Sequence, residues 1–299
     1  MAAHEVETLV SGGGFFEGPR WRDGTWWVSD FYRHAVYRVA PDGTETKVVD
    51  VDQQPSGLGW LPDGSLVIAS MKDHRLLRFA NGELSTVADL SEYAGGYLND
   101  LVVDDAGHAF VGNFGFDLQG RGAPATATLV RVDLDATMTV AALDLHFPNG
   151  AVITPEGDTL IVGETTGNQY TAFTLHADGS LTDRRVWASF GDVPTGATED
   201  EAIGQITVAP DGCTLDAEGN IWAADALGRR AVRVAPGGEI VDEITVPGSL
   251  GVYACQLGGD DGRTLLLCSA PDYFESNRSV SREAVLFTTT VDAPHAGLP

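Results

Sequence analysis

Residues 63–82 read DGSLVIASMKDHRLLRFANG, and this stretch decides the fold class. The turn at Asp63-Gly64 is followed by two short apolar runs and then by a second turn at Asn81-Gly82. Asp-Gly and Asn-Gly beside alternating apolar runs are strong hairpin signals, because both central residues of such a turn need a positive φ. The stretch therefore predicts short antiparallel strands joined by tight turns.

The same unit recurs along the whole chain. An acidic residue and a glycine precede a short apolar strand six times, with turn glycines about 40 to 60 residues apart at Gly24, Gly64, Gly107, Gly157, Gly219 and Gly262. A repeat of this length with four short strands is typical of a propeller blade. We predict an all-β, six-bladed β-propeller with four antiparallel strands per blade. It forms a single domain over residues 1–299 and has no long helix.

The two ends of the chain are predicted to close the ring. The strand-like run HEVETLV at 4–10 has a natural partner in AVLFTTTV at 284–291. Without such pairing, the last blade would leave an exposed strand edge.

Composition and charge exclude several kinds of partner. The chain has 43 acidic and 18 basic residues, a formal net charge of −25, which disfavours binding to nucleic acid or to an anionic membrane. No secretory signal or membrane span is visible, so the sequence predicts a cytoplasmic protein. Its three cysteines are interpreted as buried free thiols. Serine-hydrolase and zinc-protease motifs are absent, and the oligomeric state stays open.

Four polar residues stand just before or inside the first strand of four different units: Glu17, Asn99, Asn149 and Asp211. A single polar residue in such a place is ordinarily a turn or cap residue. Four in register, all with side-chain oxygens, are expected to meet at the propeller axis. Two carboxylates and two amide oxygens are ligands that hard divalent cations prefer.

Several segments resemble the SMP-30/gluconolactonase/LRE-like family, and also the diisopropyl-fluorophosphatase type of propeller. They are EGPRW at 17–21, LNDLVVDDAGHAFVGN at 98–113, FPNGAVITPEGDTLIVGET at 147–165, PDGCTLDAEGNIWAAD at 210–225 and ACQLGGDDGRTLLLCS at 254–269. The resemblance covers nearly all of residues 14–270. It implies a metal-dependent hydrolase, chiefly of lactones.

The resemblance also implies roles for the four residues. Glu17, Asn149 and Asp211 match the family's metal ligands, and Asn99 is a fourth, either directly or through water. Asp211 is the candidate general base. The implied cofactor is one divalent ion, with calcium preferred and Mg²⁺, Mn²⁺, Zn²⁺ or Fe²⁺ as alternatives.

The substrate side departs from the sugar-lactonase pattern. Tyr97 stands where the animal members carry a basic residue, and the predicted substrate contacts are Tyr97, Phe114, Phe116 and Asp117. Further aromatic residues are expected around the same mouth, although each is also a plausible core residue: Phe15, Phe16, Trp60 and Phe147. We therefore expect a small lactone or ester that is less polar than a sugar lactone.

Three acidic residues end strands at equivalent places: Asp30, Glu164 and Asp225. They are interpreted either as residues that hold the ligand amides and waters or as turn caps. Three other activities stay open at this point. They are phosphotriester or ester hydrolysis at the same metal, lyase or aldolase chemistry, and non-catalytic ligand binding.

Overall fold

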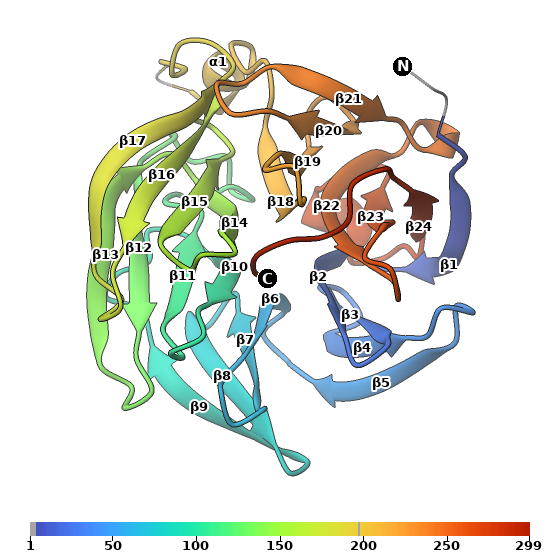
Figure 1. Cartoon of the computed structure of the whole chain (residues 1–299), viewed down its shortest axis with the longest axis horizontal. Helices are drawn as coiled ribbons and strands as arrows, with labels where there is room; N and C mark the ends of the chain where they lie inside the picture. Colours follow the sequence, from blue (N-terminus) through green and yellow to red (C-terminus); the bar gives the residue numbers. More distant parts are fainter. Residues whose placement is uncertain (1–3, 197) are drawn as a thin grey trace.

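Six four-stranded antiparallel sheets stand around a central axis in the computed structural model, which describes residues 4–196 and 198–299 (Figure 1). The predicted all-β, six-bladed β-propeller is therefore confirmed. The first strand of each blade lies nearest the axis, and the fourth lies on the outside (Figure 1).

Five blades follow the sequence order from the axis outwards. They are β2 (Phe16–Arg22), β3 (Thr25–Asp30), β4 (Ala35–Val39) and β5 (Glu45–Asp50); β6 (Pro55–Trp60), β7 (Leu66–Ser70), β8 (Arg75–Ala80) and β9 (Glu83–Asp89); β10 (Leu98–Val103), β11 (Ala109–Asn113), β12 (Ala127–Val132) and β13 (Met138–Leu145); β14 (Pro148–Ile153), β15 (Thr159–Glu164), β16 (Gln169–Leu175) and β17 (Leu181–Ser189); β18 (Pro210–Leu215), β19 (Ile221–Asp225), β20 (Arg230–Val234) and β21 (Ile240–Ile244).

The sixth blade joins the two ends of the chain. It consists of β22 (Gly251–Gly258), β23 (Thr264–Ala270), β24 (Ala284–Thr290) and, as its outer strand, β1 (Glu7–Gly13). The pairing runs from Glu7 opposite Thr288 to Gly13 opposite Ala284. The predicted closure by the N-terminal run is thus confirmed.

The repeated turns connect the first and second strands of each blade. All six predicted turn glycines have a positive φ, between 71° and 92°. The second strands lie between neighbours on both sides, and every residue of β7, β11 and β19 is buried. This explains why they are continuous apolar runs, whereas an outer strand such as β9 is largely exposed.

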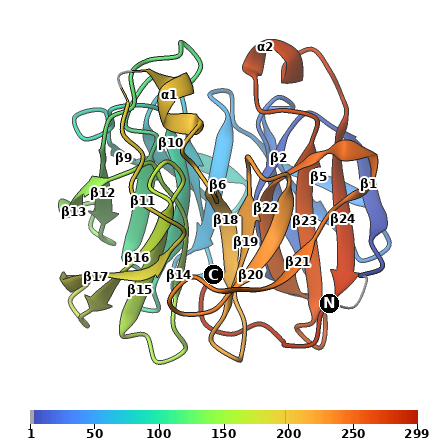
Figure 2. The ribbon, with the colours of Figure 1, turned by 90° about the horizontal axis from the view of Figure 1, so that it is seen from above.

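The two faces of the ring differ. Two short helices, α1 (Glu199–Ile203) and α2 (Glu275–Arg278), stand on one face, and the C-terminal segment crosses the other (Figure 2). There the backbone of Leu298 exchanges two hydrogen bonds with Ile153 (2.8 and 2.9 Å). A 3-10 turn, η1 (Pro247–Ser249), leads into β22.

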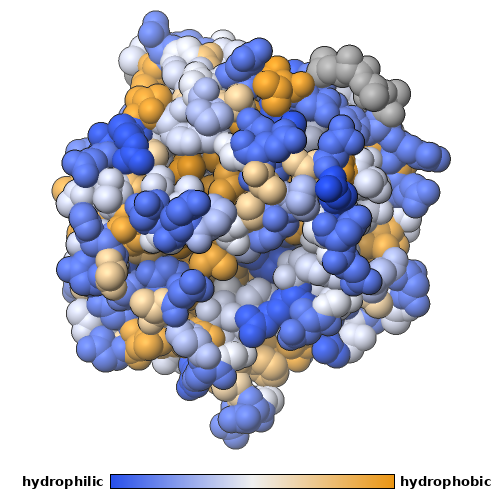
Figure 3. Space-filling model, in the orientation of Figure 1, coloured by the Kyte–Doolittle hydropathy of each residue, from blue (hydrophilic) through white to orange (hydrophobic). Residues whose placement is uncertain are grey.

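The surface agrees with the acidic composition. The face in Figure 3 is covered mainly by polar side chains, with apolar side chains in separate small groups. The three cysteines are free and buried, as predicted. No helix in the described residues is long and apolar enough to cross a membrane.

Candidate active site

The candidate site is formed at a register shift that recurs in the inner strand of every blade. In every blade the pairing of the first strand with the second shifts register near the start of the first strand. A bulge of this kind bends the strand and re-aims a side chain. Each blade has one residue of interest at or inside this register shift, which gives the set Glu17, Ser56, Asn99, Asn149, Asp211 and Tyr253.

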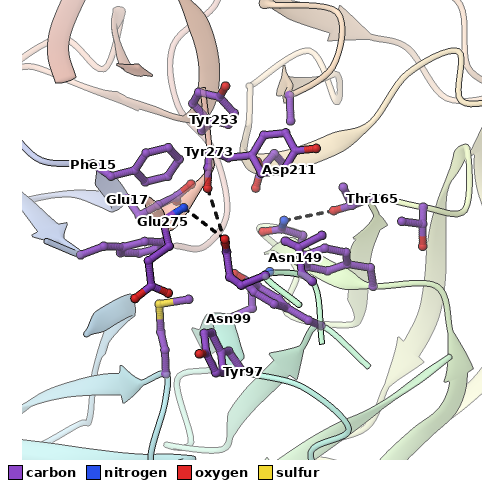
Figure 4. A pocket seen from close by; sticks show the side chains of 18 of the residues that line it. Phe15, Glu17, Tyr97, Asn99, Asn149, Thr165, Asp211, Tyr253, Tyr273 and Glu275 are labelled. Atoms are coloured by element: carbon purple, nitrogen blue, oxygen red, sulfur yellow. Dashed lines mark hydrogen bonds between the residues drawn. The ribbon is translucent and has the colours of Figure 1, made fainter. Parts of the chain in front are cut away.

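All four sequence-predicted oxygen residues belong to this set and line one pocket, on the face that carries the two helices (Figure 4). The pocket has a volume of about 850 Å³ including its open mouth. Glu17, Asn99 and Asn149 are each 6% exposed, and Asp211 is 9% exposed. The inner strands of blades one, three, four and five therefore bring these side chains together at the axis.

Hydrogen bonds hold the two amides in a fixed orientation. Asn149 donates from Nδ2 to Thr165 Oγ1 (3.0 Å), and Thr165 in turn donates to the carbonyl of Pro210 (2.7 Å). Asn99 donates from Nδ2 to the carbonyl of Pro148 (3.5 Å). Because each amide nitrogen already has a protein partner, Asn149 within its own blade and Asn99 on the next blade, the amide oxygen is the atom left for the pocket.

Glycines follow three of these residues because the next blade passes very close. A Cβ at Gly150 would lie 2.5 Å from the carbonyl oxygen of Asp211, and a Cβ at Gly18 would lie 2.6 Å from that of Ser56. Gly18 also has a φ of +53°, which favours glycine. The glycines thus let the inner strands approach until their side chains share one site.

Burial perturbs both carboxyl groups. It raises the pKa of Asp211 to about 8, although the side-chain amide of Asn149 and then the backbone amide of Gly212, which donates to Oδ1 (3.1 Å), oppose the shift. Burial and then the negative charge of Asp211 raise the pKa of Glu17 well above its usual range. A positive charge between the two groups would favour the ionised form of both.

The donor set suits a hard divalent cation. Two carboxylates and two amide oxygens supply only oxygen, as Ca²⁺ and Mg²⁺ require. The described residues contain no group of three or more His, Cys, Asp or Glu that could hold a metal. A zinc site of the histidine and cysteine type is therefore not the arrangement that these residues offer.

A buried ion pair that we did not single out from the sequence lies beside these ligands. Arg20, 3% exposed, donates to Asp100 Oδ1 (2.6 Å), and it also donates to the carbonyls of Pro19, Leu58 and Leu101. Asp100, 4% exposed, adds to the rise in the pKa of both Glu17 and Asp211. The pair ties blades one, two and three together around the axis.

The three acidic residues that end strands accept hydrogen bonds from backbone amides of connecting loops. Asp30 accepts from the amides of Gly14 and Phe15, Glu164 from that of His146, and Asp225 from that of Ala209. Each of these amides precedes a first strand, so the carboxylates fix the chain that leads into the site. Among the described residues the Asn99 and Asn149 amides donate to Pro148 and Thr165 rather than to these carboxylates, so the cap interpretation fits better.

The predicted substrate residues separate into two groups. Tyr97 and Phe114 line the pocket, as do Phe15 and Phe147. Phe116 and Asp117 instead line a neighbouring side pocket, and the Asp117 carboxylate accepts from the amide of Gly120 within its own loop (2.8 Å). This side pocket is also lined by Tyr97 and Phe114, and the Phe116 ring lies 6.0 Å from that of Phe147. Contact of Phe116 and Asp117 with substrate therefore stays a prediction.

Two further aromatic residues lie elsewhere than expected. Phe16 is 2% exposed and packs in the core beneath Arg33. Trp60 packs against Trp27, between blades one and two and outside the pocket. Phe16 precedes the bulge and Trp60 ends β6, so neither side chain faces the pocket. Alternation along the strand would have revealed this if the bulge position had been known.

Other pocket residues had no distinct signal in the sequence: Gln54, Met71, Thr165 and Tyr253. Tyr253 lies inside the register shift of the sixth blade, and alignment of all six bulges would have identified it. Thr165 is recognised only from its bond to Asn149.

Fold and site together define a class: a six-bladed propeller whose axis opens at one end into a largely aromatic pocket that holds four buried, oxygen-bearing side chains. A sequence profile of the SMP-30/gluconolactonase/LRE-like region matches residues 15–271. The chain belongs to this family.

Curated relatives at about one quarter identity are named lactonases. The 6-deoxy-6-sulfogluconolactonase of Pseudomonas putida is 25% identical over 298 residues, covering 95% of this chain and 93% of the relative. The pentonolactonase of Haloferax volcanii is 26% identical over 261 residues, covering 85% and 81%.

Solved structures support the fold. The calcium-binding protein regucalcin of Agrobacterium tumefaciens has a TM-score of 0.78 at 22% identity, with 100% of this chain and 99% of that chain covered. A luciferin-regenerating enzyme has a TM-score of 0.79 at 18% identity, with 99% of both chains covered.

Proposed function

We propose that the chain is a divalent-metal-dependent hydrolase that opens a small lactone less polar than a sugar lactone. One observation carries the proposal: four buried oxygen donors stand at equivalent bulge positions, at the base of one pocket. The lactonase names of the curated relatives support the reaction class.

Glu17, Asn99, Asn149 and Asp211 would hold the cation, which we propose to be Ca²⁺ because the donor set is all oxygen. When bound, the cation would polarise the ring carbonyl and lower the pKa of a water molecule. Glu17 contributes charge, and the two amides contribute fixed oxygens.

Asp211 is the candidate general base. It takes a proton from the attacking water as the new carbon–oxygen bond forms, and it returns that proton to the ring oxygen as the ring bond breaks. The product is a hydroxy acid. Thr165 and Gly212 position the reacting groups, since their hydrogen bonds fix Asn149 and Asp211.

Metal analysis and a lactone screen test the proposal. We expect about one calcium per chain, acid release from lactones with a pH indicator, loss of activity with chelator, and recovery when calcium is restored. Asn149→Ala should raise the calcium concentration for half-maximal activity by at least about tenfold.

Ser56→Ala is the matched control, because Ser56 holds the equivalent ring position in blade two and does not line the pocket. It should keep the calcium dependence of the wild type. Full activity in the presence of chelator would refute the metal role. If the protein hydrolyses phosphotriesters or simple esters but no lactone, the proposed lactone substrate is wrong. If it binds ligands without turnover, it is a non-catalytic propeller.

A further inference from the structure

Aromatic rings line the pocket in two separate groups. Phe15 lies 5.2 Å from Phe31 and 4.9 Å from Tyr253, measured between ring centroids. Phe114 lies 4.5 Å from Phe147 and 6.0 Å from Tyr97. Within each group the rings support one another at distances typical of favourable aromatic pairs.

The two groups face each other across the axis. The first belongs to blades one and six, and the second belongs to blades three and four, which are the opposite blades of a six-membered ring. Figure 4 shows Phe15 and Tyr253 on one side of Asn99 and Tyr97 on the other. The ligand residues therefore lie at the base of a space with an aromatic wall on either side.

Charge on the pocket lining is of one sign only. Among the described lining residues there is no lysine, arginine or histidine, whereas Glu17, Asp211 and Glu275 are acidic. Lys72, close to Tyr97, forms an ion pair with Glu275 (2.5 Å). A divalent cation would offset the two axial carboxylates, and no positive charge on the lining would remain to bind an anionic substituent.

Two of the polar groups of the lining already have partners. The amide of Gln119 donates to the carbonyl of Tyr273 (3.4 Å) and accepts from the amide of Glu275 (3.1 Å). The hydroxyl of Thr165 is bonded to both Asn149 and Pro210. These two groups are therefore not free to replace the water that a polyhydroxylated substrate would lose.

We infer that the substrate is an uncharged lactone with an aryl substituent, which lies between the two aromatic walls while the lactone ring meets the axial oxygens. The inference rests on the proposed lactone hydrolysis and names its substrate class. Aromatic stacking and burial of apolar area supply the affinity. Anionic sugar lactones are disfavoured, because the lining offers them no cation.

The test uses calcium-loaded protein and four probes: isochromanone (aryl-fused, with an alcohol leaving group), δ-valerolactone, δ-gluconolactone and the carboxylated saccharolactone. Each kcat/KM is divided by the rate of spontaneous hydrolysis of that probe. We expect isochromanone to exceed δ-valerolactone at least about tenfold, and saccharolactone to be the poorest probe. Equal values, or a preference for saccharolactone, would overturn the inference.

Variants that remove one ring test whether the aromatic walls cause the preference for isochromanone. Tyr97→Leu should lower the isochromanone to δ-valerolactone ratio several-fold. Tyr37→Leu is the control, since Tyr37 lies under Arg33 on β4, away from the pocket, and it should keep the wild-type ratio. An unchanged ratio in Tyr97→Leu would count against the role of that wall.

A binding measurement separates failure of the inference from failure of the proposed function. If no lactone is hydrolysed, the proposed hydrolysis is wrong, and calorimetry with two lactams that resist hydrolysis then decides the ligand class. Tighter binding of dihydroquinolinone than of δ-valerolactam would support the aromatic space, and equal or weaker binding would refute it.

Discussion

Asp211→Asn should have opposite effects on activity and on the stability of the metal-free protein. The carboxyl group has a pKa of about 8 in the fold, against 3.8 ordinarily, so at pH 7 the metal-free fold holds a proton that the unfolded chain has lost. Each pKa unit corresponds to about 1.36 kcal/mol, and holding this proton costs about 4 kcal/mol at pH 7. Asparagine has nearly the same shape and carries no such cost.

The chelated variant should therefore be more stable than the chelated wild type, by up to about 4 kcal/mol and about 8 °C in Tm. Part of this free-energy cost belongs to Glu17, because the two neighbouring carboxyl groups gain and lose protons as a pair. Calcium should stabilise the wild type by mass action and the variant far less. With calcium, the wild type should therefore be the more stable of the two proteins. Turnover in the variant should fall at least about a hundredfold, since it lacks the proposed base and a ligand charge.

Thermal unfolding with chelator and with calcium measures both effects. Asp225→Asn is the matched control in the same blade: it removes a buried carboxylate that accepts from Ala209, Gly228 and Arg230, so it should lower stability in both conditions by about 2 kcal/mol. A chelated Asp211→Asn protein less stable than the chelated wild type would refute the electrostatic reasoning.

The pH dependence has a defined sign. For a carboxyl group whose folded pKa is raised, stability is fully present below the unfolded pKa and is lost as pH rises through the folded pKa. The free energy of unfolding of the chelated wild type should therefore fall between about pH 4 and pH 8. Asp211→Asn should reduce this slope, and denaturant titrations at several pH values measure it.

Three further predictions concern the scaffold. Deleting residues 1–10 removes part of β1 and its pairs with β24, so Tm should fall by more than about 5 °C, and an unchanged Tm would contradict closure by this strand. Thr165→Val should weaken calcium binding about tenfold in calorimetry by releasing the Asn149 amide, while Thr165→Ser, which keeps the hydroxyl, should bind as the wild type does. Arg20→Met leaves the Asp100 carboxylate buried without its partner and should lower the free energy of unfolding in urea by about 3 kcal/mol, whereas a neutral result would mean that water replaces the guanidinium.

The architecture could be predicted because its signals are local. Each Asp-Gly, Glu-Gly or Ala-Gly turn needs glycine at positive φ, and each second strand is apolar throughout because both of its faces are covered. The same local rules identified the pairing of the two chain ends, since a strand near each end lacked another partner.

The side of the strand that a residue occupies was less predictable. Asn99 and Asp211 were found because an oxygen-bearing residue before an apolar run is unusual when it repeats. Trp60 and Phe16 were misplaced because composition does not show which way a strand or bulge turns an aromatic ring. The Arg20–Asp100 ion pair joins two segments that are far apart in the sequence and meet only in the folded ring, so no local sequence pattern predicts it.

The ring is closed by pairing β1 with β24, and this has a consequence for synthesis of the chain. During translation β1 is made before every other strand, but its partner β24 is made after all the others. Until then β1 has no neighbour in its sheet. The oxygen site draws on both sides of that seam, with Glu17 just after it and Asp211 one blade before it, so the nascent chain has no complete site until its last blade is formed.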